Sequence, residues 1–141
     1  MPDRKLVIRL EPRAEALSEM LDRLEAYAAE VELPSRVAHR LTVICEELAA
    51  NVAMHGAGGE GGATYIEITI DRQGDSVRFS FEDNGRPFDP LVQSRPNTEL
   101  NLEDRPIGGL GIHFVRSLVT DISYQRLDGI NRLTAVLDGA K

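Results

Sequence analysis

Cysteine, long apolar runs and positive charge are all scarce in this sequence, and each scarcity excludes something. Cys45 is its one cysteine, so no disulfide can form within the chain, and its place in an apolar helical pattern is typical of a small buried side chain. No apolar run approaches the roughly 20 residues of a membrane span, and the N-terminus lacks the apolar core of a signal peptide. A single cysteine also fits a reducing compartment. We therefore expect a cytoplasmic protein that has no membrane partner.

Basic residues are outnumbered, because 16 Lys and Arg stand against 23 Asp and Glu and give a formal net charge of −7 at pH 7. This charge argues against general nucleic-acid binding. A local phosphate site remains compatible with it, since backbone amides, a few arginines or a metal ion can supply the positive potential. The 141 residues contain no internal repeat and no linker, so the sequence predicts a single domain over residues 1–141.

The most informative segment is residues 35–56, SRVAHRLTVICEELAANVAMHG. Its apolar residues recur every three or four positions, the period of a buried helix face, and they are Leu41, Ile44, Cys45, Leu48 and Val52. Ser35 is a candidate N-cap for this helix. Glu47, Asn51 and His55 form a second stripe beside the apolar one. Taken alone, that stripe fits either a pocket wall or a polar boundary that bonds to its neighbours.

The remaining segments predict the order β-α-α-β-β-lid-α-β-β. Alternating apolar residues predict strands over 5–10, 65–71, 76–82, 121–126 and 131–137. A first helix is predicted over 13–33, with Leu17, Leu21, Leu24, Ala28 and Val31 on its apolar face, and a last helix over 112–119. Hairpin turns at 73–75 and 128–129 imply a mixed, mostly antiparallel sheet. With three helices burying apolar stripes on one face of it, the expected fold class is α+β, a two-layer sandwich.

Two further stretches contain residues suited to nucleotide binding. The glycines of Gly108-Gly109-Leu110-Gly111 open the last predicted helix, where backbone amides can approach a phosphate closely. This stretch is neither a Rossmann fingerprint nor a P-loop, and alone it is more simply a turn that begins a helix. Asp83-Asn84-Gly85 ends a predicted strand, where a carboxylate can accept a hydrogen bond from an exocyclic amine. Alone, it also fits an ordinary Asx turn.

The combination is more specific than its parts. The sequence contains, in order, Glu47-x3-Asn51-x3-His55-Gly56, Asp83-x-Gly85-x-Pro87-Phe88-Asp89-Pro90, Gly108-Gly109-Leu110-Gly111-Ile112 and Asn131-Arg132-Leu133-Thr134. This set resembles the ATP-site boxes of the GHKL superfamily, which includes gyrase, Hsp90, histidine kinases and MutL-type ATPases. The segments PFDP and GGLGIHFVRSLV look most like those of the stand-alone anti-sigma-factor serine/threonine kinases. The box that begins at Asp83 lacks the second glycine found in gyrase and Hsp90. This difference favours the stand-alone kinase branch of the superfamily.

The resemblance implies roles for the residues that match its first two boxes. Glu47 would be the general base that takes the proton from a serine hydroxyl as it attacks the γ-phosphate. Asn51 would hold Mg²⁺, an ion that keeps several waters and needs few protein ligands. Asp83 would bind the adenine amine and Gly85 would leave room for the base. His55 is expected to be structural.

The resemblance also implies how the rest of the nucleotide is held. The stretch of Gly108, Gly109, Leu110 and Gly111 would cradle the phosphates, and residues 90–107 would form an ATP lid. Arg95 or Arg105 would neutralise phosphate charge there. Thr134 would assist adenine binding through a water.

The function that the resemblance implies is an ATP-dependent protein serine/threonine kinase that phosphorylates an anti-sigma-factor antagonist and sequesters a sigma factor. The alternative is a non-catalytic regulatory module in which bound nucleotide sets the lid and gates a partner protein. The presence of Glu47 favours the enzyme, since a pure binder needs no base at that spacing. A generic α+β domain with fortuitous motifs is the third reading. The apolar face of the first helix is the candidate surface for a homodimer or partner, although the sequence does not distinguish such a surface from core.

Overall fold

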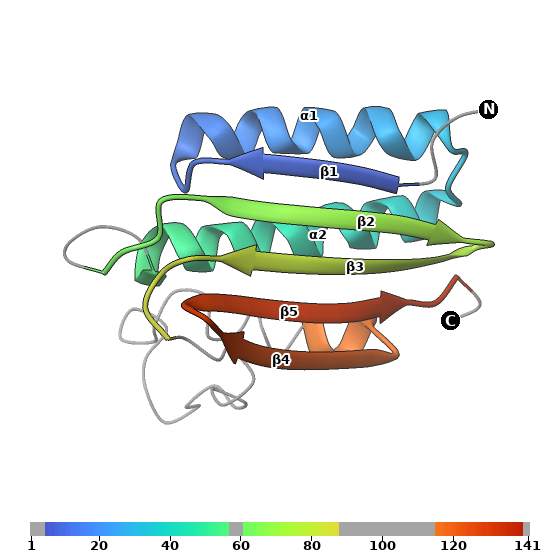
Figure 1. Ribbon diagram of the computed structural model, residues 1–141. Helices are drawn as coiled ribbons and strands as arrows, with labels where there is room; N and C mark the ends of the chain where they lie inside the picture. Colours follow the sequence, from blue (N-terminus) through green and yellow to red (C-terminus); the bar gives the residue numbers. More distant parts are fainter. Residues whose placement is uncertain (1–4, 57–60, 88–114, 140–141) are drawn as a thin grey trace, which may run out of the picture.

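The computed structural model describes residues 5–56, 61–87 and 115–139 (Figure 1). The elements in these ranges are β1 (Lys5–Leu10), α1 (Ala14–Glu30), α2 (Ser35–Asn51), the π-helical turn η1 (Val52–Gly56), β2 (Ile66–Gln73), β3 (Ser76–Asp83), β4 (Asp121–Leu127) and β5 (Ile130–Leu137). Residues 115–118 are also helical and form the described part of the predicted last helix. None of the helices in these ranges has the length and apolar character needed to cross a membrane.

The strands form one sheet in the order β1-β2-β3-β5-β4, and each described pair of neighbours is antiparallel. The described sheet is therefore fully antiparallel rather than mixed. Both predicted hairpins are present, with Gln73 opposite Ser76 in one and Leu127 opposite Ile130 in the other. In the second hairpin Asp128 and Gly129 have φ values of 52° and 79°, the left-handed conformations that match a two-residue turn to the twist of its strands.

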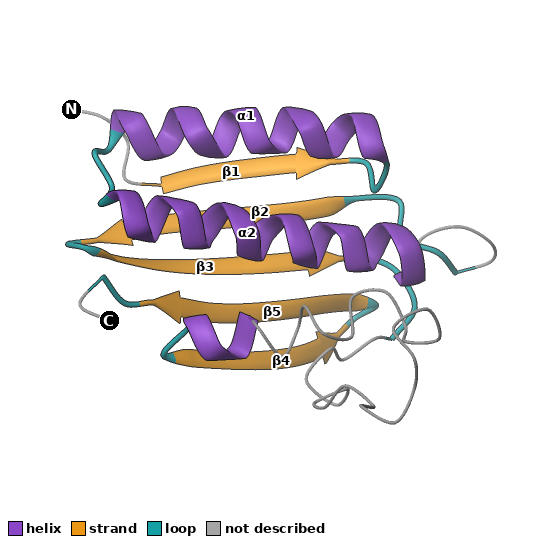
Figure 2. Ribbon diagram, turned by 180° about the vertical axis from the view of Figure 1, so that it is seen from behind, coloured by secondary structure: helices purple, strands orange, loops and turns teal. Residues whose placement is uncertain are grey.

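The helices cover one face of this sheet, as Figure 2 shows, and this arrangement confirms the predicted two-layer α+β sandwich. The strands bury alternate side chains against the helices, namely Ile66, Ile68, Ile70, Val77, Phe79, Phe81, Leu133, Ala135 and Leu137. Burial of this apolar surface contributes about 25 cal/mol per Å² to the stability of the fold. Successive residues of a strand point to opposite faces of the sheet. A polar side chain can therefore lie beneath the helices only where it occupies the same alternate positions as these buried residues.

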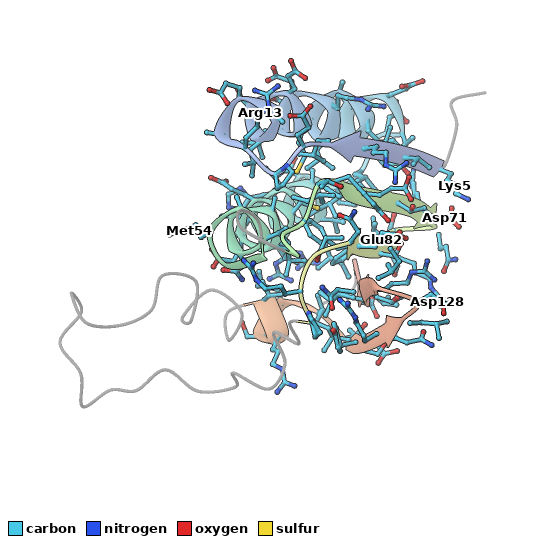
Figure 3. The ribbon with its side chains drawn as sticks, turned by 60° about the vertical axis from the view of Figure 1, so that its left-hand side comes forward. Lys5, Arg13, Met54, Asp71, Glu82 and Asp128 are labelled. Atoms are coloured by element: carbon cyan, nitrogen blue, oxygen red, sulfur yellow. The ribbon has the colours of Figure 1, made fainter. Side chains whose placement is uncertain are left out.

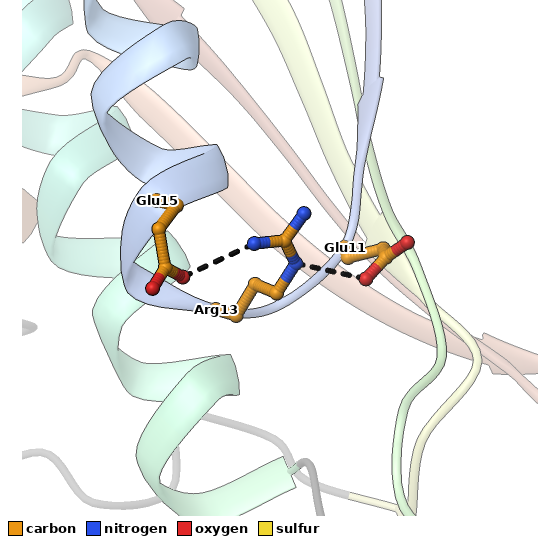
Figure 4. Close-up of polar contacts among 3 residues, drawn as sticks. All are labelled: Glu11, Arg13 and Glu15. Carbon is orange, nitrogen blue, oxygen red and sulfur yellow. Dashed lines mark hydrogen bonds and ion pairs between the residues drawn. The ribbon is translucent and has the colours of Figure 1, made fainter.

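The other face of the sheet is polar. Glu82 is paired there with Arg132 at 3.1 Å between carboxylate and guanidinium. Lys5, Asp71 and Glu82, all labelled in Figure 3, lie on this face. Where the chain passes from β1 to α1, Arg13 lies between two carboxylates, with distances of 2.9 Å to Glu11 and 3.1 Å to Glu15 (Figure 4). These exposed pairs add little stability, since solvent screens them.

The predicted apolar face of the first helix is confirmed in part, because Leu24 and Val31 are buried while the rest of the buried stripe is shifted around the helix. Its buried residues are Ala16, Met20, Leu24 and Tyr27, followed by Val31 just after the helix. Leu17, Leu21 and Ala28 are only partly buried, because they lie one residue, about 100°, around the helix from that stripe. Leu21 and Ala28 instead line a groove between α1 and α2.

The central helix begins and ends differently from the prediction. Ser35 is its first helical residue rather than its N-cap, because Pro34, with ψ of 140°, takes the extended capping position and no side chain bonds to the helix start. The regular α-helix ends at Asn51, and Val52 to Gly56 continue as a π-helix. Its predicted apolar stripe is confirmed, since Leu41, Ile44, Cys45, Leu48 and Val52 are all buried. A π-helical turn is rare and is often found at functional sites.

Candidate functional site

A pocket lies where the end of α2 meets the end of β3 and the start of β5, the end of the molecule that Figure 3 brings forward. It is open to solvent, and its lining residues are Leu48, Asn51, Val52, Phe81, Asp83, Tyr124, Asn131 and Leu133. Among the described residues, the buried polar or charged ones are Asn51, Asp83 and Asn131, and all of these line this pocket. Apolar walls with a few converging polar groups are typical of a small-molecule site.

Asp83 lines the pocket because alternate side chains of β3 point toward the helices, and Asp83 is one of them. Val77, Phe79 and Phe81 face the helices, so the next residue in that phase is buried as well, and Asp83 is only 7% exposed. Its Oδ1 atom accepts hydrogen bonds from the Gly85 amide at 2.8 Å and from Asn131 Nδ2 at 3.1 Å. Within the described ranges the other carboxylate oxygen of Asp83, Oδ2, accepts no hydrogen bond, so it can accept one from a ligand.

The environment of Asp83 disfavours its charged form. Burial raises the pKa of its carboxyl group, and the nearby Glu82 charge acts in the same direction. The Gly85 amide, the Asn131 amide and the Arg126 charge oppose the shift but do not cancel it. A raised pKa is the property of a carboxylate that is held partly out of water and is incompletely paired.

Asn131 lies directly opposite Asp83 in the β3–β5 pairing. Its Nδ2 donates to Asp83 and, at 2.8 Å, to the Arg86 carbonyl. Its Oδ1 accepts from the Tyr124 hydroxyl and, at 3.1 Å, from Arg126 Nη1. The same Arg126 nitrogen donates to the Gly85 carbonyl at 2.7 Å. These bonds tie the segment after β3 to the β4–β5 hairpin.

Tyr124, Arg126 and Asn131 had no predicted role, although Asn131 is the first residue of the last sequence box. The hairpin turn at 128–129 does predict that Arg126 and Asn131 face each other across β4 and β5. An asparagine in the buried phase of a strand was a further signal. The contact with Asp83 depends on the pairing of β3 with β5, which are far apart in the sequence, and no local pattern reveals that register.

The second box also has a structural residue. Asn84 Oδ1 accepts hydrogen bonds from the Thr64 amide at 2.8 Å and the Tyr65 amide at 3.2 Å. Its Nδ2 donates to the Thr64 hydroxyl at 2.8 Å. Asn84 thereby fixes the chain leaving β3 against the chain that enters β2, and Gly85 follows it as a buried residue.

The structure brings Asn51 into the pocket with Asp83 and places Glu47 one helical turn earlier. Asn51 is 7% exposed, while Glu47 is half-buried and is not among the residues that line the pocket. Burial raises the pKa of the Glu47 carboxyl group, and the charge of Glu46 raises it further. No group of three or more His, Cys, Asp or Glu side chains suited to a metal occurs in the described ranges.

Other predicted site residues fall elsewhere. Thr134 pairs with Ser80 and Ser123 and alternates with the pocket residue Leu133, so its side chain faces the polar side of the sheet and is not brought to the pocket. Outside the described residues lie the predicted lid (90–107) with Arg95 and Arg105, and the stretch of Gly108, Gly109, Leu110 and Gly111. The side chain of His55 is likewise not described.

Cys45 is a core residue, as predicted. It is fully buried, and burial raises the pKa of its thiol to about 12. The thiol is therefore protonated at neutral pH and has no nucleophilic role.

Comparison with known proteins agrees with this geometry. Residues 10–137 match the model of the histidine kinase-like ATPase domain family. The serine/threonine-protein kinase BtrW of Bordetella bronchiseptica is 30% identical over 127 residues, which cover 90% of this chain and 89% of that protein.

Two solved structures share the fold at lower identity. The RsbU and RsbW domains of Rv1364c from Mycobacterium tuberculosis match with a TM-score of 0.65 and 18% identity, over 94% of this chain and only 32% of that one. The SiaB-SiaC complex from Pseudomonas aeruginosa matches with a TM-score of 0.56 and 15% identity, over 96% and 91%. The family model covers both long helices and four of the five described strands, and it leaves out β1 except for Leu10. The chain therefore belongs to the family of histidine kinase-like ATPase domains.

Proposed function

We propose that the protein is an ATP-dependent serine/threonine kinase of the cytoplasm that phosphorylates an anti-sigma-factor antagonist and, as an anti-sigma factor, sequesters a sigma factor. One observation carries the nucleotide part of this proposal: the buried polar residues of the described chain, Asn51, Asp83 and Asn131, converge on one apolar-walled pocket. A relative named as a serine/threonine-protein kinase supports the kinase part, and the resemblance of the sequence boxes to anti-sigma-factor kinases supports the anti-sigma part.

The pocket fits an adenine base. Its apolar walls, formed by Leu48, Val52, Phe81 and Leu133, can contact the faces of a flat ring. Asp83 Oδ2 is an acceptor at the wall of this pocket, and the exocyclic amine of adenine is a donor. A carboxylate that accepts from an N–H forms a stronger hydrogen bond than a neutral acceptor does.

Asn51 is the residue proposed to hold Mg²⁺. Its carboxamide oxygen is a ligand of the kind that Mg²⁺ prefers, and one protein ligand suffices when phosphates and water supply the others. The ion, when bound, would neutralise charge on the triphosphate. The stretch 108–111 would contribute backbone amides to the phosphates, and 90–107 would close over them.

Glu47 is the proposed general base. In the transfer step the serine oxygen forms a bond to the γ-phosphorus, the bond from that phosphorus to ADP breaks, and the serine proton passes to the Glu47 carboxylate. Its raised pKa makes this carboxylate a better proton acceptor than an exposed glutamate.

The partly buried apolar residues of α1 remain the candidate surface for a homodimer.

Two variants separate the kinase from the alternative, a nucleotide-gated module without transfer. Glu47→Gln keeps the shape of the side chain and removes the base, so we expect ADP affinity within about twofold of wild type and a transfer rate lower by a factor on the order of 100 or more. Asp83→Ala should lose both ADP binding and transfer. Binding would be measured by calorimetry with MgADP, and transfer by phosphate incorporation from ATP into a candidate antagonist protein.

The outcomes differ for each reading. Transfer by Glu47→Gln at the wild-type rate would show that Glu47 is not the base. ADP binding by the wild type without transfer to any antagonist would favour the regulatory module. Full ADP affinity in Asp83→Ala would refute the assignment of the pocket.

A further inference from the structure

We propose that Asn131 is the positioning residue for base recognition, because it fixes the Asp83 carboxylate in the orientation that selects a base with an exocyclic amine. This inference rests on the proposed nucleotide site and adds to it a specificity determinant on another strand. Asn131 is 4% exposed and lies opposite Asp83 in the register of β3 and β5.

The hydrogen bonds of Asn131 determine the orientation of its amide group. Nδ2 donates to two acceptors, the Asp83 carboxylate and the Arg86 carbonyl. Oδ1 accepts from two donors, the Tyr124 hydroxyl and the Arg126 guanidinium. A flipped amide would face the donor at Arg126 with a donor, and the acceptors at Asp83 and Arg86 with an acceptor. These three contacts therefore favour one orientation, while the Tyr124 hydroxyl can pair with either end of the amide.

The fixed amide in turn fixes Asp83. Two donors from different parts of the chain, Asn131 Nδ2 and the Gly85 amide, hold the same oxygen, Oδ1, at 3.1 Å and 2.8 Å. The carboxyl group therefore cannot rotate without breaking both bonds, and Oδ2 is the oxygen left to meet a ligand. A carboxylate oxygen accepts and does not donate, so it favours an amine over a carbonyl at that position of the base.

Asn131 acts through Asp83 rather than by direct contact with the base. Its two N–H groups and its oxygen already have partners among the described residues, so the amide has no regular hydrogen-bonding position left for a ligand. Holding an acceptor in place before the ligand arrives lowers the ordering cost of binding. Loss of the Asn131 amide should therefore reduce discrimination between bases more than it reduces general affinity.

The test compares ADP with inosine diphosphate, in which a carbonyl replaces the exocyclic amine, by calorimetry in the presence of Mg²⁺. We expect wild type to bind ADP on the order of 100-fold more tightly, since inosine diphosphate would lose the hydrogen bond to the carboxylate and leave this buried acceptor unpaired. In Asn131→Ala the Kd for ADP should rise by about 10-fold, the effect of one lost charge-assisted hydrogen bond, while that for inosine diphosphate changes by less than about twofold. The ratio of the two constants should fall to about 10.

Two further variants make the test specific. Tyr124→Phe removes only the hydroxyl that bonds to Asn131 Oδ1, so the ratio should fall in the same direction by about twofold to fivefold. This variant keeps the ring and carries the test if Asn131→Ala does not fold. Gln125→Ala changes the exposed neighbour of Tyr124 on β4 and should leave both constants unchanged.

Equal weakening of both ligands in Asn131→Ala would mean that Asn131 only supports the pocket, and would overturn the inference. An unchanged ratio in both Asn131→Ala and Tyr124→Phe would overturn it as well. A wild type that binds ADP and inosine diphosphate equally would refute the selection by Asp83 while leaving nucleotide binding intact. A wild type that binds neither would refute the proposed function itself.

Discussion

Asp83, the proposed acceptor for the base, lowers the stability of the fold at neutral pH. Its carboxyl group is buried at the end of the apolar face of β3, and burial raises its pKa. The folded protein therefore binds the proton of this group more tightly than the unfolded chain does. The stability that depends on this group is present below the ordinary aspartate pKa of about 3.9 and is lost as pH rises through the folded pKa.

Asp83→Asn should consequently stabilise the protein at neutral pH while weakening nucleotide binding. The amide oxygen can still accept from Gly85 and Asn131, whereas the new NH₂ group would meet the amine of adenine as a second donor. We expect unfolding free energy to rise by about 1 kcal/mol at pH 7, as is common when a functional residue is replaced. The gain should shrink as pH falls toward 4, and urea unfolding at a series of pH values measures both.

The control for this variant is Asp128→Asn. Asp128 is exposed in the β4–β5 turn with φ of 52°, a conformation that asparagine adopts readily. Its substitution should change stability by less than about 0.5 kcal/mol at any of these pH values. If Asp83→Asn is destabilising at pH 7 by more than this control, the carboxylate is better stabilised in the fold than its burial implies.

At the scale of elements, α1 has two apolar stripes and only one of them belongs to the core. Leu24 is 1% exposed beneath the helix, whereas Leu21 is partly buried in the groove toward α2. The two leucines are chemically identical and lie three residues apart. Their sequence context assigned them to the same face.

The structure therefore predicts unequal costs for the same substitution. Leu24→Ala removes core contacts and should lower the free energy of unfolding by about 2–5 kcal/mol. Leu21→Ala should lower it by about 1 kcal/mol, since part of the side chain already contacts water. Urea unfolding of the two variants side by side measures the difference, and equal losses would show that the groove is closed in solution.

The end of α2 is the other element whose form shapes the pocket. Asn51 is the last α-helical residue, and the π-helical turn that follows places Val52 in the pocket wall beside it. A helical wheel of constant period predicted the buried stripe as far as Val52. It could not predict the change of helix type, because no residue from Asn51 to Gly56 marks one in the sequence.

For the whole molecule, local patterns were enough to predict the strands, the two hairpins and the two-layer α+β fold, although they implied a mixed sheet where the described one is fully antiparallel. For Asn51 and Asp83 they left two readings open, a pocket or a polar boundary for one and an amine acceptor or an Asx turn for the other, and only the resemblance of the combined boxes assigned both residues to the nucleotide pocket. The contact between Asn131 and Asp83 was not predicted, because it depends on β3 pairing with β5, which are far apart in the sequence. Thr134 was assigned from the resemblance alone, and the strand alternation that turns it away from the pocket was not used.

The pocket joins α2, β3, β4 and β5, so a ligand bound there should stabilise the described domain as one unit. At a concentration 100 times its Kd, MgADP should add about 2.7 kcal/mol to the free energy of unfolding. For a chain of this size the added stability corresponds to a rise in Tm of roughly 5–15 °C, measured by thermal unfolding as a single transition. Asp83→Ala should show no rise at the same MgADP concentration, because it lacks the acceptor for the base. Two separate transitions, with only one of them shifted by MgADP, would mean that the helix and the hairpin do not unfold together and that the pocket is not part of one cooperative core.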